Sequence, residues 1–95
     1  MKTEWKEFSK RYKQANELRG DSKTLEFFAC VDSDGKWFDS SDSFQTAVHW
    51  CRYYAGDFES TPNDITWMSE NAPKLGYSVI HGSVLKKMWE KGLIS

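Results

Sequence analysis

Apolar side chains near the N-terminus recur at helical spacing. Thr3 can cap this segment, and the pattern ends near Leu18, before Arg19-Gly20-Asp21-Ser22 interrupts it. The sequence therefore predicts a first helix with one narrow apolar stripe, formed by Trp5, Phe8, Tyr12 and Ala15. Lysines recur at intervals of four and three on a different face of this helix, at Lys6, Lys10 and Lys13.

Two short β-prone runs follow, at residues 25–31 and 36–39. Between them lies Asp32-Ser33-Asp34-Gly35, in which the acidic residues favour a turn and Gly35 supplies the positive φ of a type I turn with a bulge. We expect a two-stranded antiparallel hairpin. Because two strands alone are marginally stable, a helix should cover one of its faces.

Residues 44–55 show a broad apolar arc at helical spacing. Residues 39–43 offer several N-caps, and Gly56 follows as a C-cap. Gln45, His49 and Arg52 are predicted to point to solvent. The predicted buried arc contains Phe44, Ala47, Val48, Trp50, Cys51, Tyr54 and Ala55.

The next helix is predicted to start after Thr61, its cap, with Pro62 in the first helical position and Pro73 ending it. Ile65, Met68 and Ala72 share its apolar face. Trp67 falls almost opposite that face, so we expect an exposed ring.

A final helix is predicted from its cap Ser78 to Gly92, with Leu93 folding back on its last turn. Its buried arc comprises Ile80, Val84, Leu85, Met88 and Trp89, and His81 within that arc is expected to be a satisfied core histidine. With the preceding helix and the turn at residues 74–77, it forms a helix-turn-helix-like pair.

These elements predict a small α+β domain of order α-β-β-α-α-α. With 95 residues, the chain is expected to form one domain, in which residues 1–60 carry helix, hairpin and helix and residues 61–95 carry the helix-turn-helix-like pair.

Composition narrows the class of protein. Aromatics make up 16% of the residues although the mean hydropathy is -0.71, so burial is concentrated in a few large rings. No apolar run is long enough to span a bilayer and no signal core precedes the first helix, so we expect a cytoplasmic protein without a membrane partner. Cys30 and Cys51 are expected to be reduced and buried, a single disulfide being the alternative.

Charge is segregated along the chain. Residues 1–24 carry seven basic and four acidic side chains, residues 25–64 two and eight, and residues 65–95 four and two. The basic ends can dock on phosphate or on an acidic protein surface, or they can pair with the acidic middle.

The sequence gives little support for a metal site or a catalytic site. An EF-hand reading places Cys30 at the first ligand position and Ser41 at the twelfth, so the bidentate carboxylate is missing. His49 projects away from Cys51 on the predicted helix, which argues against a thiolate pair. We expect no enzyme, no metal and no cofactor.

Two binding modes remain. For nucleic acid, the final helix would present Ser83, Lys86, Lys87 and Lys91, supported by Lys74, although no arginine follows Arg52 to read guanine. For a protein partner, the candidates are the rings of Trp67, Tyr53 and Tyr77, with the lysines of the first helix.

Residues 63–95 resemble the second and third helices of winged-helix DNA-binding domains, in which an ending like Lys91-Gly92-Leu93-Ile94 leads into the wing. No wing follows here, which favours a docking surface over a groove reader. The layout as a whole is similar to small accessory proteins of phages and mobile elements. This resemblance implies a monomeric or homodimeric interaction protein that modulates or inhibits a host nucleic-acid-handling complex, an anti-defence or anti-CRISPR-like role being one form. The alternative is a transcriptional regulator that binds duplex DNA.

Overall fold

A computed structural model describes residues 4–16 and 23–95, and only the backbone for residues 11–16. The described part is α+β, with five helices and one antiparallel three-stranded sheet. The elements are, in chain order, α1 (Trp5–Asn16), β1 (Phe28–Val31), β2 (Trp37–Ser41), α2 (Phe44–Ala55), α3 (Asp64–Glu70), α4 (Ala72–Leu75), β3 (Ser78–His81) and α5 (Gly82–Glu90).

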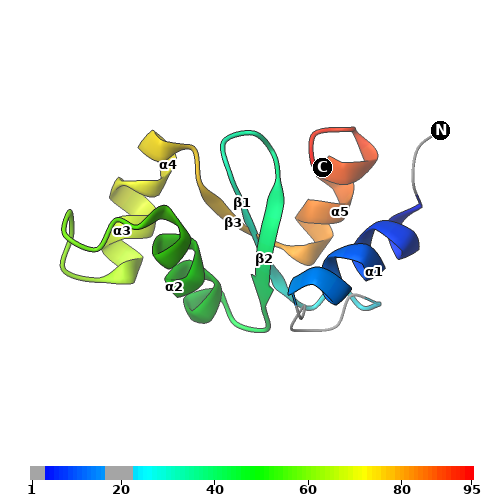
Figure 1. The fold of residues 1–95 in the computed structure, drawn as a ribbon, viewed down its shortest axis with the longest axis horizontal. Helices are drawn as coiled ribbons and strands as arrows, with labels where there is room; N and C mark the ends of the chain where they lie inside the picture. Colours follow the sequence, from blue (N-terminus) through cyan, green and yellow to red (C-terminus); the bar gives the residue numbers. More distant parts are fainter. Residues whose placement is uncertain (1–3, 17–22) are drawn as a thin grey trace.

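The sheet lies between two layers of helices (Figure 1). α1 and α5 lie on one side of it, and α2, α3 and α4 lie on the other, which gives the molecule extents of 42 × 22 × 20 Å. Strand order is β2-β1-β3, so β1 is central. Both faces of the sheet are therefore covered, whereas the sequence predicts one covered face.

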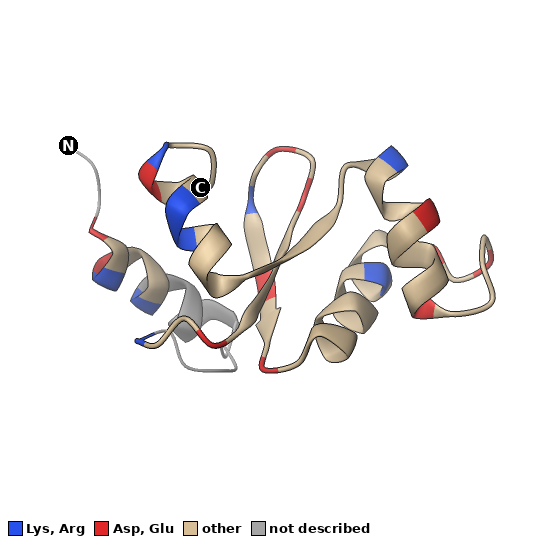
Figure 2. Ribbon diagram, turned by 180° about the vertical axis from the view of Figure 1, so that it is seen from behind, with Lys and Arg blue, Asp and Glu red and all other residues tan. Residues whose placement is uncertain are grey.

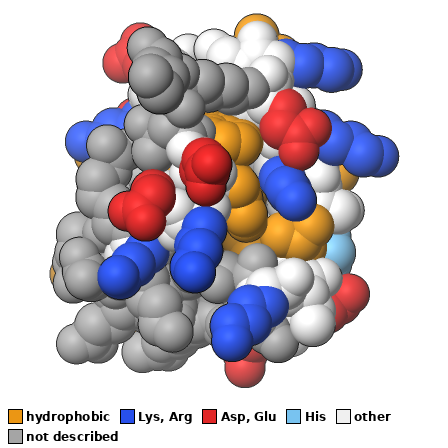
Figure 3. Space-filling view, turned by 90° about the vertical axis from the view of Figure 1, so that its right-hand side faces the viewer, with side chains coloured by type: hydrophobic (Ala, Val, Ile, Leu, Met, Phe, Trp, Pro, Cys, Tyr) orange, Lys and Arg blue, Asp and Glu red, His pale blue; other side chains and the backbone are white. Residues whose placement is uncertain are grey.

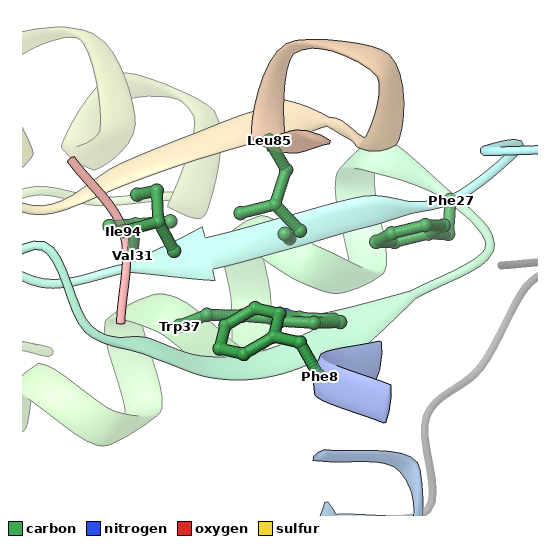
Figure 4. Packing of buried hydrophobic residues seen from close by; sticks show 7 residues of the cluster. Phe8, Phe27, Val31, Trp37, Leu85 and Ile94 are labelled. Carbon is green, nitrogen blue, oxygen red and sulfur yellow. The ribbon is translucent and has the colours of Figure 1, made fainter. Parts of the chain in front are cut away.

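Alternation along β1 supplies both cores. Ala29 and Val31 face the α1–α5 side, and Cys30 faces the α2 side. On the α1–α5 side the buried residues form a first core, shown in Figure 4: Phe8, Phe27, Ala29, Val31, Trp37, Leu85 and Ile94. On the other side they form a second core: Cys30, Phe38, Ala47, Cys51, Trp67 and Ala72.

The third strand corrects the predicted order of elements. Ser78 does not cap a helix, because residues 78–81 pair antiparallel with β1, with Ala29 opposite Ile80. The observed order is α-β-β-α-α-α-β-α. β3 separates α4 from α5, so the expected tight turn between the two helices of a helix-turn-helix is absent from the described fold.

His81 caps α5 in place of Ser78. Its Nδ1 accepts a hydrogen bond from the backbone N–H of Ser83 at 3.2 Å. Gly82 follows at the first helical position and donates its N–H to the carbonyl of Phe27 at 2.8 Å. The strand thus turns directly into the helix.

The hairpin turn forms as predicted. Oδ1 of Asp32 accepts from the N–H groups of Asp34 and Lys36 at 2.9 and 3.0 Å, and Gly35 has φ 76°. The strands differ from the predicted runs: β1 begins at Phe28, β2 extends to Ser41, and the register shifts between Cys30 and Val31.

Helix ends are partly as predicted. Ser43 caps α2 and Gly56 ends it in the left-handed conformation. α3 is capped by Asn63 rather than Thr61, and it ends at Glu70, so Pro73 lies within α4.

After α5 the chain packs back on the core through Ile94 and not through Leu93, the predicted residue. Gly92 is left-handed, and the N–H of Leu93 donates to the carbonyl of Met88 at 2.9 Å, as a Schellman-type ending requires. The side chain of Leu93 is nevertheless exposed, and Ile94 is the residue that packs into the first core.

Candidate binding surfaces

Lysines predicted for two different partners lie around one pocket. Lys6 and Lys10 on α1, Lys23 before β1 and Lys86 on α5 line a hollow of about 400 Å³, which we call the lysine pocket. Figure 3 views the molecule from this end and shows basic side chains around exposed apolar ones, with acidic side chains also present on the face. The other described lining residues are Trp5, Ser9 and Leu25.

The apolar part of the lysine pocket is held by the first core. The Trp5 ring stacks on Trp37 with centroids 5.9 Å apart and planes 4° apart, and it meets Trp89 edge-on at 5.6 Å. The Trp5 side chain is partly exposed, but its indole nitrogen is buried and, among the described residues, has no hydrogen-bond partner. The ring is therefore fixed in place with an unused donor.

Leu25 lines the same pocket in a strained conformation. Its φ is 65°, a left-handed value that L-residues other than Asn and Asp rarely adopt. Leu25 also packs against the first core. Strain of this kind often accompanies functional sites.

The predicted nucleic-acid face is divided by the fold. Lys86, Lys87 and Lys91 lie on or just after α5, and Lys87 and Lys91 are exposed. Lys74 lies on α4, in the opposite helical layer, so it does not support that face (Figure 2). The hydroxyl of Ser83 is engaged with Nδ1 of His81 at 2.9 Å. The side chain of Lys13 lies outside the described residues, as do those of Tyr12 and Ala15.

The prediction for Trp67 is wrong. Its side chain has 0% exposure in the second core, and its Nε1 donates to Oδ2 of Asp57 at 2.9 Å. Ile65, predicted to be buried, is exposed instead. α3 has only seven residues and is rotated so that its single large ring fills the space beside α2.

The two tyrosines predicted as contact residues, Tyr77 and Tyr53, differ in exposure. Tyr77 is half-buried and packs edge-on against Phe38 at 6.0 Å, so it supports the second core. Tyr53 is 63% exposed on α2, as its prediction as a contact residue requires. Its ring lies 5.8 Å from that of Trp50 and 6.0 Å from that of Phe58.

Trp50, Tyr53 and Phe58 form what we call the α2 aromatic surface. The sequence pattern does not single out Phe58, which follows Asp57 in a short acidic segment, and it predicts Trp50 in the core, whereas Trp50 is half-buried. Tyr54, also predicted to be buried, is exposed and stacks on Phe38 at 4.2 Å.

Arg52 was predicted to point to solvent and is 3% exposed. Its Nε donates to the carbonyl of Asp57 at 2.7 Å, Nη2 to the carbonyl of Thr61 at 2.7 Å, and Nη1 to Oδ1 of Asp64 at 3.1 Å. Its guanidinium also lies 5.3 Å from the ring centroid of Phe58. Arg52 therefore fixes the segment that carries part of the α2 aromatic surface.

The two histidines make hydrogen bonds within the fold, and the two cysteines are buried in it. Nδ1 of exposed His49 lies 3.0 Å from Oδ2 of Asp64, and His81 is half-buried rather than a core residue. Cys30 and Cys51 are free and buried, as predicted. The thiol of Cys30 donates to the carbonyl of Ala47 at 3.1 Å. A hydrogen bond with Cys51, together with burial, raises the pKa of Cys30 far above its ordinary value, which opposes formation of a thiolate.

Within residues 4–16 and 23–95, no three His, Cys, Asp or Glu side chains are grouped as metal ligands would be. In the same part of the chain, every helix is too short or too polar to cross a membrane.

The chain matches no known protein family, and neither a curated protein nor a solved structure is significantly similar to it.

Proposed function

We propose that this protein acts by binding rather than by catalysis, as an interaction protein that docks on a nucleic-acid-handling complex of its host and modulates or inhibits it. The α2 aromatic surface carries this proposal. Tyr53 is 63% exposed and Phe58 lies beside it, held by a segment that the buried Arg52 anchors. Large rings held rigidly at a surface make strong contacts at low entropic cost, which is why Tyr and Trp dominate hot spots of protein interfaces.

Charge supports the choice of partner. The lysine pocket lies in the α1–α5 layer, and acidic side chains lie on α3 and in the segment before it, beyond the opposite face of the sheet (Figure 2). Assemblies that handle nucleic acids combine basic channels with anionic polymer, so a bipolar protein finds complementary charge for both ends.

Affinity capture from the host tests this function. The wild-type protein is compared with the double variant Tyr53→Ala, Phe58→Ala and with Leu93→Ala, which truncates an exposed apolar side chain elsewhere. We expect the double variant to lose a nuclease, polymerase or related complex that Leu93→Ala retains, and the wild-type protein to change the activity of that purified complex. An unchanged partner set, or partners unrelated to nucleic acids, would remove the proposal.

The second candidate is a regulator that binds duplex DNA through Lys86, Lys87 and Lys91. The grouping of Lys86 with the lysines of α1 favours it. Direct binding should weaken steeply with salt, because each neutralised phosphate releases counterions. The variant Lys87→Glu, Lys91→Glu should then abolish binding. Absence of duplex binding at low salt would exclude this candidate.

A further inference from the structure

We infer that the lysine pocket is a nucleotide-binding site, which takes a phosphate group and a flat base joined through a sugar. The inference concerns the α1–α5 side of the molecule and does not depend on the α2 aromatic surface. Its ligand class follows from the size, the charge and the apolar part of the pocket.

The size of the pocket suits a small ligand. Its volume of about 400 Å³ falls within the range of roughly 300–1,000 Å³ that is typical of small-molecule sites. α1, the segment that leads into β1, and α5 each contribute lining residues, so tertiary packing creates the hollow.

The charge of the pocket suits phosphate. Its charged described lining residues are Lys6, Lys10, Lys23 and Lys86, and none of the described lining residues is acidic. Ammonium groups that reach a hollow from several directions suit a phosphate, which carries up to two negative charges and several acceptor oxygens. Ser9 adds a hydroxyl among the same lining residues, although it already donates to the carbonyl of Lys6 at 3.3 Å.

The apolar part of the pocket suits a base. Trp5 is partly exposed, and its contacts with Trp37, Phe8 and Trp89 hold the ring in one orientation. A base of any sequence can stack on such a ring. A nucleotide carries the anionic group and the flat ring on one small molecule, whereas a peptide needs a separate residue for each, and for that reason we favour a nucleotide over an acidic peptide.

The strained Leu25 belongs to the same site. Space on its carbonyl side is closed by α5, because a Cβ atom added to Gly82 would lie 2.6 Å from the Leu25 carbonyl oxygen. The close approach of these two backbones and the left-handed φ of Leu25 together fix this part of the pocket wall. This part of the wall is thus formed before any ligand arrives, which reduces the ordering cost of binding.

Calorimetric titration of the whole chain tests the site. Adenosine 5′-monophosphate is compared with inorganic phosphate, adenosine, a short single-stranded oligodeoxyadenylate and polyglutamate. We expect the nucleotide to bind more tightly than either phosphate or adenosine alone, with an affinity that falls as salt is raised. Affinity for the oligodeoxyadenylate at least tenfold above that for the mononucleotide would identify a strand as the source of the ligand, and equal or weaker affinity would identify the free nucleotide.

Variants locate the binding. The double variant Lys10→Met, Lys86→Met keeps the aliphatic stems and should weaken nucleotide binding by about tenfold or more, since two charged contacts are lost. Lys36→Met, which replaces an exposed lysine beside the β1–β2 turn and outside the described lining of the pocket, is the control and should leave affinity unchanged. Equal melting temperatures for the three proteins would show that folding is intact. Failure of both nucleotide ligands to bind, equal affinity for polyglutamate, or indifference to the double variant would each overturn the inference.

Discussion

The guanidinium of Arg52 and the carboxylate of Asp64 join α2 to α3 through a hydrogen-bonded ion pair of 3.1 Å. Arg52 is buried, whereas the Asp64 side chain is 32% exposed. Water therefore screens one partner only, and much of the contribution of Arg52 comes from the two backbone carbonyls that it also satisfies.

Replacement of Arg52 by Met should destabilise the protein by about 2 kcal/mol, because two partly buried backbone carbonyls lose their donor and Asp64 loses its cation. Urea unfolding followed by circular dichroism measures the change. Lys74→Met removes an exposed cation and serves as the control, for which we expect a change within about 0.5 kcal/mol. Equal stability of both variants would show that the network contributes nothing.

Asp57 should give the protein a stability that depends on pH. Hydrogen bonds from Ser60 and then from Trp67, with Arg52 nearby, hold the pKa of Asp57 below its ordinary value of 3.8. The folded state therefore binds this proton less readily than the unfolded state. The resulting stabilisation is complete above the unfolded pKa and is lost as pH falls below 3.8 through the folded pKa. We expect Asp57→Asn to be less stable than wild type at pH 6, with the difference shrinking under acidic conditions. A difference that stays constant with pH would contradict the assignment.

Truncation should destabilise the protein strongly at Trp67 and hardly at all at Tyr53. Trp67→Ala empties the second core and should cost about 3–5 kcal/mol, whereas Tyr53→Ala at an exposed position should change stability by about 0.5 kcal/mol or less. Thermal and denaturant unfolding of the two variants provide the comparison. A binding defect in Trp67→Ala would consequently report unfolding rather than a lost contact. Equal stabilities would place Trp67 at the surface after all.

Gly82 is required by the close approach of α5 to residues 25–27. Alanine there would bring Cβ within 2.6 Å of both the Leu25 carbonyl oxygen and the Phe27 ring. Helix propensity alone predicts that Gly82→Ala stabilises the protein by up to about 1 kcal/mol, but overpacking should reverse the sign and cost about 1–3 kcal/mol.

Gly56→Ala provides the comparison for Gly82. Gly56 has φ 71° and open space around its Cα, so this variant carries only the strain of a left-handed residue, about 1 kcal/mol. Calorimetric melting of both variants measures the two effects separately. Stabilisation by Gly82→Ala would mean that α5 can move away from residues 25–27.

Cys30 and Cys51 should resist alkylation in the folded protein. Both thiols are buried, and the raised pKa of Cys30 leaves almost no thiolate to react. Mass spectrometry after iodoacetamide treatment at pH 8 should show an unmodified native protein and two modifications in urea. Rapid modification of the native protein would show that the second core opens readily.

Local chemistry determined much of the fold. Asp32 and Gly35 specify the hairpin turn, Ser43 and Gly56 bound α2, and Gly92 ends α5, since each acts through backbone groups a few residues away. The exposure of Tyr53 and the burial of the two cysteines also follow from the sequence pattern.

Contacts between residues far apart in the sequence determined the features that local sequence patterns do not specify. The run Ser78–His81 fits a strand or a helix by its apolar pattern, and only the free edge of β1 makes it a strand. α3 is too short for its pattern to define a face, so the space beside α2 selects Trp67 over Ile65. Arg52 is buried because distant carbonyls satisfy its donors. Likewise, Lys10 and Lys86 meet at one pocket because α1 and α5 cover the same face of the sheet, a long-range packing that side-chain periodicity within each helix does not encode.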